Sequence, residues 1–227
     1  MPSKPGKVAQ QFWSHERGPY ALLFLLVFTL FILGPLLSAR LIGPLILEIA
    51  VAAVLISGAH TATKRTSVRL LAIVVGLLSV VIRASGLFSG LTTQAVESLL
   101  SAGMLIALAL LMGRTFIIQE RDQARRIVGA VTIYLLLGLM WTRLYQFLES
   151  VNPGSFHFPA GEGSNAAALT YFSFVTLATL GYGDITPVSV IARDLAVLEA
   201  IMGQLYLVIL ISRLVSEGVS KPGNNQG

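Results

Sequence analysis

Residues 179–184 read Thr-Leu-Gly-Tyr-Gly-Asp and combine groups that could bind a cation through the backbone. Carbonyl groups of successive residues can point to one side only if alternate residues leave the ordinary φ/ψ regions. Gly181 and Gly183 can do so without a Cβ penalty. Thr179 can offer a hydroxyl as well as a carbonyl at the start of this run, and Asp184 places a carboxylate at its end. The stretch could therefore present a row of oxygen atoms to a metal cation.

This stretch resembles the selectivity filter of potassium channels, which usually reads Thr-Val-Gly-Tyr-Gly followed by Asp. The resemblance extends over residues 127–216 and implies that four copies of one loop replace the water around K⁺ with backbone carbonyls. Leu180 stands where the family more often has Val, an apolar exchange that affects fine tuning only. Leu180 and Tyr182 are expected to turn away from the ion and pack behind the loop. The implied ligands of K⁺ are Thr179, Leu180, Gly181 and Tyr182, and Gly183 completes the filter.

Other functions use similar residues. Gly-Tyr-Gly is also a common loop tripeptide. The Gly-x-Gly-Asp pattern at residues 181–184 occurs in intramembrane aspartyl proteases, but these enzymes need a second carboxylate facing the first. Asp122 lies in a basic loop and Asp194 lies ten residues past Asp184, so neither sits in the middle of an earlier span. Potassium transporters usually carry several degraded filters, whereas this chain has one intact copy. We therefore expect a channel and not an enzyme, and a weakly selective cation channel remains an alternative.

The composition is typical of an integral membrane protein. Of the 227 residues, 55% are hydrophobic and 12% are charged, and the mean hydropathy is +0.78. This profile indicates a polytopic membrane protein. The absence of cysteine excludes disulfides and thiolate metal sites. A small chain without cysteine suits a bacterial inner membrane. The basic residues lie in short loops between apolar segments, which argues against nucleic-acid binding, and no cofactor other than bound K⁺ is expected.

Six apolar segments approach the ~20 residues that a transmembrane helix needs. We predict an all-α fold with spans at about 20–38, 41–59, 68–88, 95–113, 127–148 and 188–212. The shorter apolar segment 166–178 is too short to span the membrane and precedes the filter. Asn165 or Ser164 could cap it as a re-entrant pore helix, whose carbonyl end would then favour a cation at the membrane centre.

The distribution of basic residues predicts the topology. With both termini in the cytoplasm, twelve of the sixteen Lys and Arg residues lie on the cytoplasmic side, as the positive-inside rule requires. The four others are Arg40, Arg83, Arg143 and Arg193. This topology places the filter loop and Asp184 on the outer side.

The chain divides into four expected units. These are a cytoplasmic segment (1–19), a four-helix transmembrane domain (20–126), a pore domain (127–216) and a cytoplasmic tail (217–227). One filter per chain implies a homotetramer in the lipid bilayer. The fourth span has no basic residue, so we expect little or no voltage sensing. No soluble regulatory domain is expected after the sixth span, although a separate regulatory subunit remains open.

Several residues are expected to support the filter. The family resemblance implies that Tyr171 on the pore helix forms a hydrogen bond with Asp184. Glu199 is ionisable within the sixth span, so it needs water, a proton or a partner. Thr176 or Thr170 of the pore helix is the expected partner.

The sixth span also contains residues expected to act in gating. Gly203 matches the position of the family's inner-helix glycine, which could act as a hinge or allow close helix packing. Leu210, Ile211 and Leu214 could narrow the inner mouth as an apolar constriction.

Two charges lie inside the first four spans. Glu48 in the second span and Arg83 in the third have similar expected depths. They could form a buried pair, or Arg83 could extend its side chain toward the outer surface.

Overall fold

The computed structural model describes residues 18–33, 43–63, 66–85, 91–120, 122–160, 163 and 165–219, and these are mostly helical. The helices are α2 (Gly18–Val27), the π-helical η1 (Phe28–Leu33), α4 (Gly43–Ala62), α5 (Thr66–Ser85), α6 (Leu91–Met112), the π-helical η2 (Gly113–Gln119), α7 (Gln123–Val151), α8 (Ala166–Leu177) and α9 (Val190–Val219). Two short strands, β1 (Phe156–His157) and β2 (Thr186–Pro187), pair antiparallel.

Three helical stretches among the described residues are long and apolar enough to cross a membrane. They cover Gln94–Gln119, Gln123–Val151 and Val190–Arg213, and they correspond to the fourth, fifth and sixth predicted spans. The predicted first three spans appear as helices whose described apolar parts are shorter, namely Gly18–Leu30, Glu48–Ala62 and Thr66–Val81. The expected total of six spans therefore stays a prediction.

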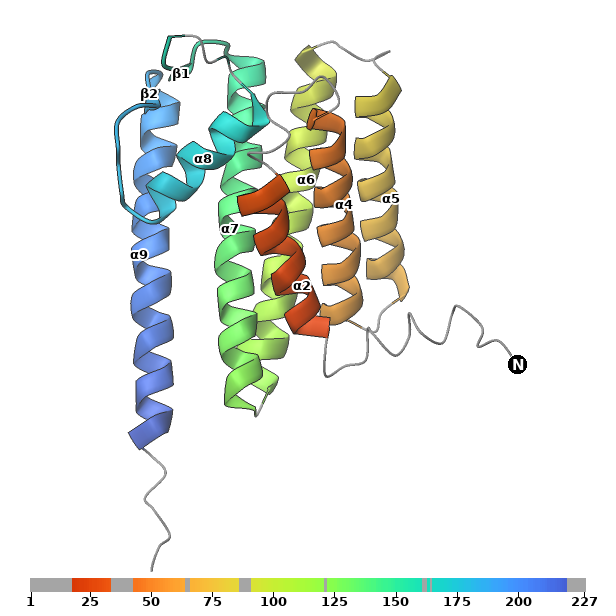
Figure 1. Cartoon of the computed structure of the whole chain (residues 1–227), viewed down its shortest axis with the longest axis vertical. Helices are drawn as coiled ribbons and strands as arrows, with labels where there is room; N and C mark the ends of the chain where they lie inside the picture. The colour runs from red at the N-terminus through yellow and green to blue at the C-terminus, as the bar shows by residue number, and fades with distance from the viewer. Residues whose placement is uncertain are drawn as a thin grey trace, which may run out of the picture.

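The helices form one connected packing arrangement around α7. Figure 1 shows α4, α5 and α6 on one side of α7 and α9 on the opposite side, with α2 packed against α7 and α4. Helix α8 crosses obliquely between α7 and α9. The buried hydrophobic residues form one cluster that extends from Leu22 in α2 to Ala192 in α9. The predicted boundary between a four-helix domain and a pore domain thus falls within a shared core.

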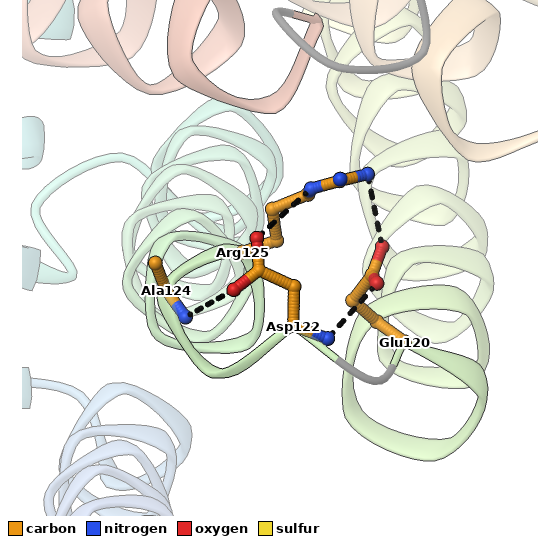
Figure 2. Close-up of polar contacts among 4 residues, drawn as sticks. All are labelled: Glu120, Asp122, Ala124 and Arg125. Carbon is orange, nitrogen blue, oxygen red and sulfur yellow. Dashed lines mark hydrogen bonds and ion pairs between the residues drawn. The ribbon is translucent and has the colours of Figure 1, made fainter.

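A very short connection joins η2 to α7 (Figure 2). Asp122 caps α7 by accepting a hydrogen bond from the Ala124 N–H at 3.1 Å, the usual role of an N-terminal aspartate. Arg125 lies beside two carboxylates, with its Nε 3.2 Å from Asp122 Oδ2 and its Nη1 3.6 Å from Glu120 Oε2. Because the connection is so short, α6 and α7 pack as an antiparallel hairpin of one chain.

The segment after α7 returns to the residues that follow the filter. Phe156 pairs with Pro187 and His157 with Thr186. The Val188 N–H donates to the Ser155 carbonyl at 2.8 Å. These contacts fix the start of α9 relative to the end of α7, and so fix both ends of the α8 and filter segment.

Candidate functional site

Helix α8 begins at an asparagine cap and ends in a tight turn that leads into the filter sequence. Asn165 Oδ1 accepts a hydrogen bond from the Ala168 N–H at 2.8 Å, which confirms the expected cap. At the other end, the N–H groups of residues 178–180 bond to carbonyls of the last turn. The shortest of these bonds join Thr179 to Thr176 and Leu180 to Val175, both at 2.9 Å. The twelve-residue helix is shorter than a membrane span, as predicted.

The filter residues alternate between left-handed and ordinary backbone. Thr179, Gly181 and Gly183 have φ angles of 57°, 58° and 79°. Thr179 is the only non-glycine residue with positive φ in the described part of the chain, a conformation that costs a residue with a Cβ about 1–2 kcal/mol. Sequence reasoning identified the two glycines but not the strained threonine. The alternation is the backbone pattern needed for successive carbonyl groups to share one side.

Every residue from Thr179 to Asp184 is exposed in the single chain. The side chain of Leu180 is 56% exposed and that of Tyr182 is 67% exposed. The expected packing behind the loop is therefore not made within one chain, apart from a stacking contact between Tyr182 and Tyr171 with ring centroids 6.5 Å apart. Figure 1 shows the loop that joins α8 to β2 on the side of the molecule away from α4 and α5.

Asp184 forms the hydrogen bond expected from the sequence. The Tyr171 hydroxyl donates to Asp184 Oδ2 at 2.6 Å, and the Ile185 N–H donates to Oδ1 at 3.0 Å. These two bonds, the tyrosine first, hold the pKa of this carboxyl below its ordinary value. Asp184 is thus an ionised carboxylate at neutral pH at the end of the filter.

Glu199 is fully buried where three helices meet. Its Oε1 accepts from the Ser173 hydroxyl of α8 at 2.6 Å, and its Oε2 accepts from the Tyr145 hydroxyl of α7 at 2.5 Å. The prediction that Thr176 or Thr170 is the partner of Glu199 was therefore wrong. Ser173 lies between them at three-residue spacing, so the sequence indicated the correct face of α8 but not the correct turn. The depth at which α9 packs against α8 decides which turn faces Glu199.

Gly203 lies against the end of α8. A Cβ at this position would overlap the Leu177 carbonyl oxygen, and the same oxygen accepts a hydrogen bond from the Tyr134 hydroxyl at 3.2 Å. The packing role considered for Gly203 is therefore present. Helix α9 continues without interruption through this position, and the hinge role stays a prediction.

The predicted gate residues lie near the far end of α9. Leu210 is partly buried and Ile211 is exposed, and the side chain of Leu214 lies outside the described residues. Tyr206 donates a hydrogen bond to the Ala130 carbonyl at 2.7 Å and ties this part of α9 to α7. The constriction at the inner mouth stays a prediction.

Glu48 has a partner that sequence reasoning missed. Arg143 Nη2 of α7 lies 2.8 Å from Glu48 Oε2 of α4, and both side chains are buried. Arg143 also donates to Gln146 Oε1 at 3.2 Å. The side chain of Arg83, the expected partner, lies outside the described residues. Because 95 positions separate Glu48 from Arg143, only the packing of α4 on α7 reveals this pair.

Asp122 and Asp184 lie too far apart to form the pair of carboxylates that an aspartyl protease needs. Asp122 caps the start of α7, whereas Asp184 lies beside β2, whose partner strand β1 follows the end of α7. A helix of 29 residues is about 43 Å long at ~1.5 Å per residue. These two carboxylates therefore cannot share a proton.

A sequence match to a family of known proteins covers the region that contains this site. A family model described as "Ion channel" matches residues 127–219, the range from α7 to α9. "Two pore potassium channel c" of Oryza sativa subsp. japonica is 41% identical over 64 residues, which cover 28% of this chain and 14% of that protein. "Two-pore potassium channel 3" of Arabidopsis thaliana is 32% identical over 97 residues, which cover 43% of this chain and 20% of that protein.

The chain thus spans a fifth or less of the length of these curated relatives. Both relatives are named as potassium channels. They point to an ion channel and not to an enzyme.

Proposed function

We propose that this chain is one subunit of a homotetrameric potassium channel in a lipid bilayer, in which the carbonyl groups of Thr179, Leu180, Gly181 and Tyr182 coordinate dehydrated K⁺. The observation that carries the proposal is the alternation of positive φ at Thr179, Gly181 and Gly183 in an exposed loop. One such loop supplies oxygens from one side only. Four copies around an axis would supply the full shell that replaces water.

The position of α8 supports cation binding at this loop. The C-terminal end of a helix carries a partial negative charge of about half an electron. Helix α8 ends at Leu177, two residues before Thr179, so its negative end is close along the chain to the proposed ligands of K⁺. Asp184 adds an ionised carboxylate at the other end of the loop and would raise the local concentration of cations.

The polar loop also supports the proposed tetramer. Irregular backbone does not face lipid within the hydrocarbon region, and is tolerated only where protein buries it or water reaches it. Residues 179–184 and much of α9 are exposed in one chain. Neighbouring copies would cover Leu180 and Tyr182 and leave the carbonyl groups on the axis.

We also propose that the first four helices contribute little or no voltage sensing. The described residues of α6 contain no Lys or Arg, and Arg114 follows in η2. Moving one charge through 100 mV supplies only ~2.3 kcal/mol, so steep sensing needs several charges. Channel opening should therefore depend little on voltage.

Ion flux into liposomes tests the proposal. Liposomes with the purified chain should take up K⁺ much faster than Na⁺. Gly181→Ala should abolish that preference, because a Cβ is strained at a φ of 58°. Gly163→Ala is the control, because its added Cβ meets nothing within 4 Å. Equal K⁺ and Na⁺ uptake by the unaltered chain would instead favour the weakly selective channel.

The oligomeric state needs its own measurement. Light scattering of the detergent-solubilised chain should give a protein mass four times the 24.3 kDa of one chain. A stable monomer or dimer that still conducts K⁺ would contradict the proposed four-fold pore.

A further inference from the structure

We propose that Glu199 is a positioning residue of the filter, which fixes α8 between α7 and α9 through Tyr145 and Ser173. This inference rests on the proposed channel function for its consequence in conduction, but the positioning itself can be measured without conduction.

The contact of Glu199 joins three elements that are distant in sequence. Tyr145 belongs to α7, Ser173 to α8 and Glu199 to α9, and the two hydroxyl groups occupy different oxygens of the carboxyl group. Ser173 Oγ also lies 2.8 Å from the Gly138 carbonyl of α7. A Cβ at Gly138 would lie 2.5 Å from the Phe174 ring, so the glycine lets α8 approach α7 closely enough for these bonds.

The buried surroundings of these hydrogen bonds favour one position of α8 between α7 and α9. Tyr145 packs edge-to-face against Phe156 and Phe172, with ring centroids 5.3 and 5.2 Å apart. Glu199 and Ser173 are both completely buried. Hydrogen bonds are stronger in such apolar surroundings, and an unpaired polar group there is costly. A shift of α8 by one turn would remove the Ser173 hydroxyl from Glu199 Oε1, while Tyr145 of α7 would stay in place.

Two contacts then hold the end of α8 that leads into the filter. Glu199 holds Ser173, and one turn farther along α9 the close approach at Gly203 supports the Leu177 carbonyl. Between these points, the Val175 carbonyl accepts the Leu180 N–H and directs the first turn of the filter. Glu199 therefore acts on ion coordination indirectly, through the position of α8.

Hydrogen–deuterium exchange on the purified protein in detergent tests the positioning. Glu199→Leu removes both acceptors at similar volume, so amides in residues 173–184 should exchange about tenfold faster, while amides in α4 and α6 keep their rates. Ser173→Ala should give a smaller acceleration in the same segment. Thr170→Val is the matched control, because the Thr170 hydroxyl bonds only to the Ala166 carbonyl of its own helix.

The conservative variant separates positioning from charge. Glu199→Gln retains one acceptor and gains a donor that can bond to the Tyr145 oxygen, so it should restore exchange to within about threefold of the unaltered chain. Unchanged exchange in residues 173–184 of Glu199→Leu would overturn the proposal, as would a uniform acceleration over all helices.

Conduction supplies the functional readout. In planar bilayers, Glu199→Leu tetramers should lose about tenfold in the ratio of K⁺ to Na⁺ permeability or in mean open time, and Glu199→Gln should retain both within about threefold. If the exchange result holds but the unaltered chain does not conduct, the proposed channel function fails and the positioning role stands. If the unaltered chain conducts and Glu199→Leu matches it in both quantities, the positioning proposal fails.

Discussion

Helices α7 and α9 both pack against α8, but they differ strongly in how much of their surface is buried within one chain. In the most apolar part of each helix, 67% of the residues are buried in α7 and 56% in the α6 segment, whereas only 11% are buried in α9. Helices α6 and α7 thus bury more than half of their most apolar residues within the chain, whereas α9 leaves most of its own exposed. The α9 side, with the exposed filter loop, is complete only when something outside the chain covers it.

The buried carboxylates of Glu48 in α4 and Glu199 in α9 also have different kinds of partner. Glu48 is held by the guanidinium of Arg143 and links α4 to α7. Glu199 is held by two hydroxyl groups and links α7, α8 and α9. In the first contact the donor is a charged guanidinium, whereas in the second both donors are uncharged hydroxyl groups.

Breaking the buried ion pair between Glu48 and Arg143 should lower the free energy of unfolding more than the other substitutions below. Arg143→Leu would leave Glu48 as a buried charge without this partner, and such a loss typically costs about 3–5 kcal/mol. Unfolding in mixed detergent measures the change. The double variant Arg143→Leu/Glu48→Leu should recover most of the loss, because no charge is then left behind. A single variant as stable as the unaltered chain would show that the pair is not a significant link.

Filling the contact between α9 and α8 should have the next largest effect. Gly203→Ala would push a methyl group into the Leu177 carbonyl, and such overpacking costs about 1–3 kcal/mol. Gly103→Ala in α6 is the matched control, because its Cβ meets nothing within 4 Å, and alanine should stabilise a helix there by about 0.5–1 kcal/mol. Equal unfolding free energies for the two variants would argue against close packing at Gly203.

Removing the hydrogen bond from Tyr171 to Asp184 should change how the stability of the fold depends on pH in the acid range. The pKa of Asp184 is lower in the folded chain than its ordinary value. The contact therefore stabilises the fold above that ordinary value, and this contribution is lost as the pH falls through the lower, folded pKa. Tyr171→Phe should flatten the decline of the melting temperature between about pH 5 and pH 2. Parallel melting curves for the two proteins over that range would contradict the role of the hydrogen bond.

The ion pairs at the connection between η2 and α7 should matter least. Arg125→Ala removes two partly exposed contacts, and pairs of this kind contribute about 0.2–1 kcal/mol. The loss should shrink further at 1 M salt, because screening weakens exposed charges. Asp122→Ala serves for comparison, because loss of a cap costs about 1 kcal/mol whatever the salt concentration. A larger, salt-independent effect of Arg125→Ala would place this connection among the principal links of the fold.

Local sequence signals predicted several parts of the site well. The α8 helix ends within one residue of the expected segment 166–178, because an asparagine cap and a short apolar run determine it locally. The hydrogen bond from Tyr171 to Asp184 was implied by the family resemblance, and the structure contains it. Positive φ at Gly181 and Gly183 was expected because glycine alone tolerates it freely. The cap and the glycine conformations depend on groups within one turn or one loop, whereas Tyr171 and Asp184 are 13 positions apart.

The sequence by itself determined which residues could form helices, a cap and a carbonyl-lined loop, because those properties depend on neighbours along the chain. Only the tertiary structure decided that Glu199 meets Tyr145 and Ser173 and that Glu48 meets Arg143. Those contacts depend on the depth and rotation at which whole helices pack. An apolar helix face is compatible with many such arrangements, so its sequence pattern does not specify which polar group it will meet.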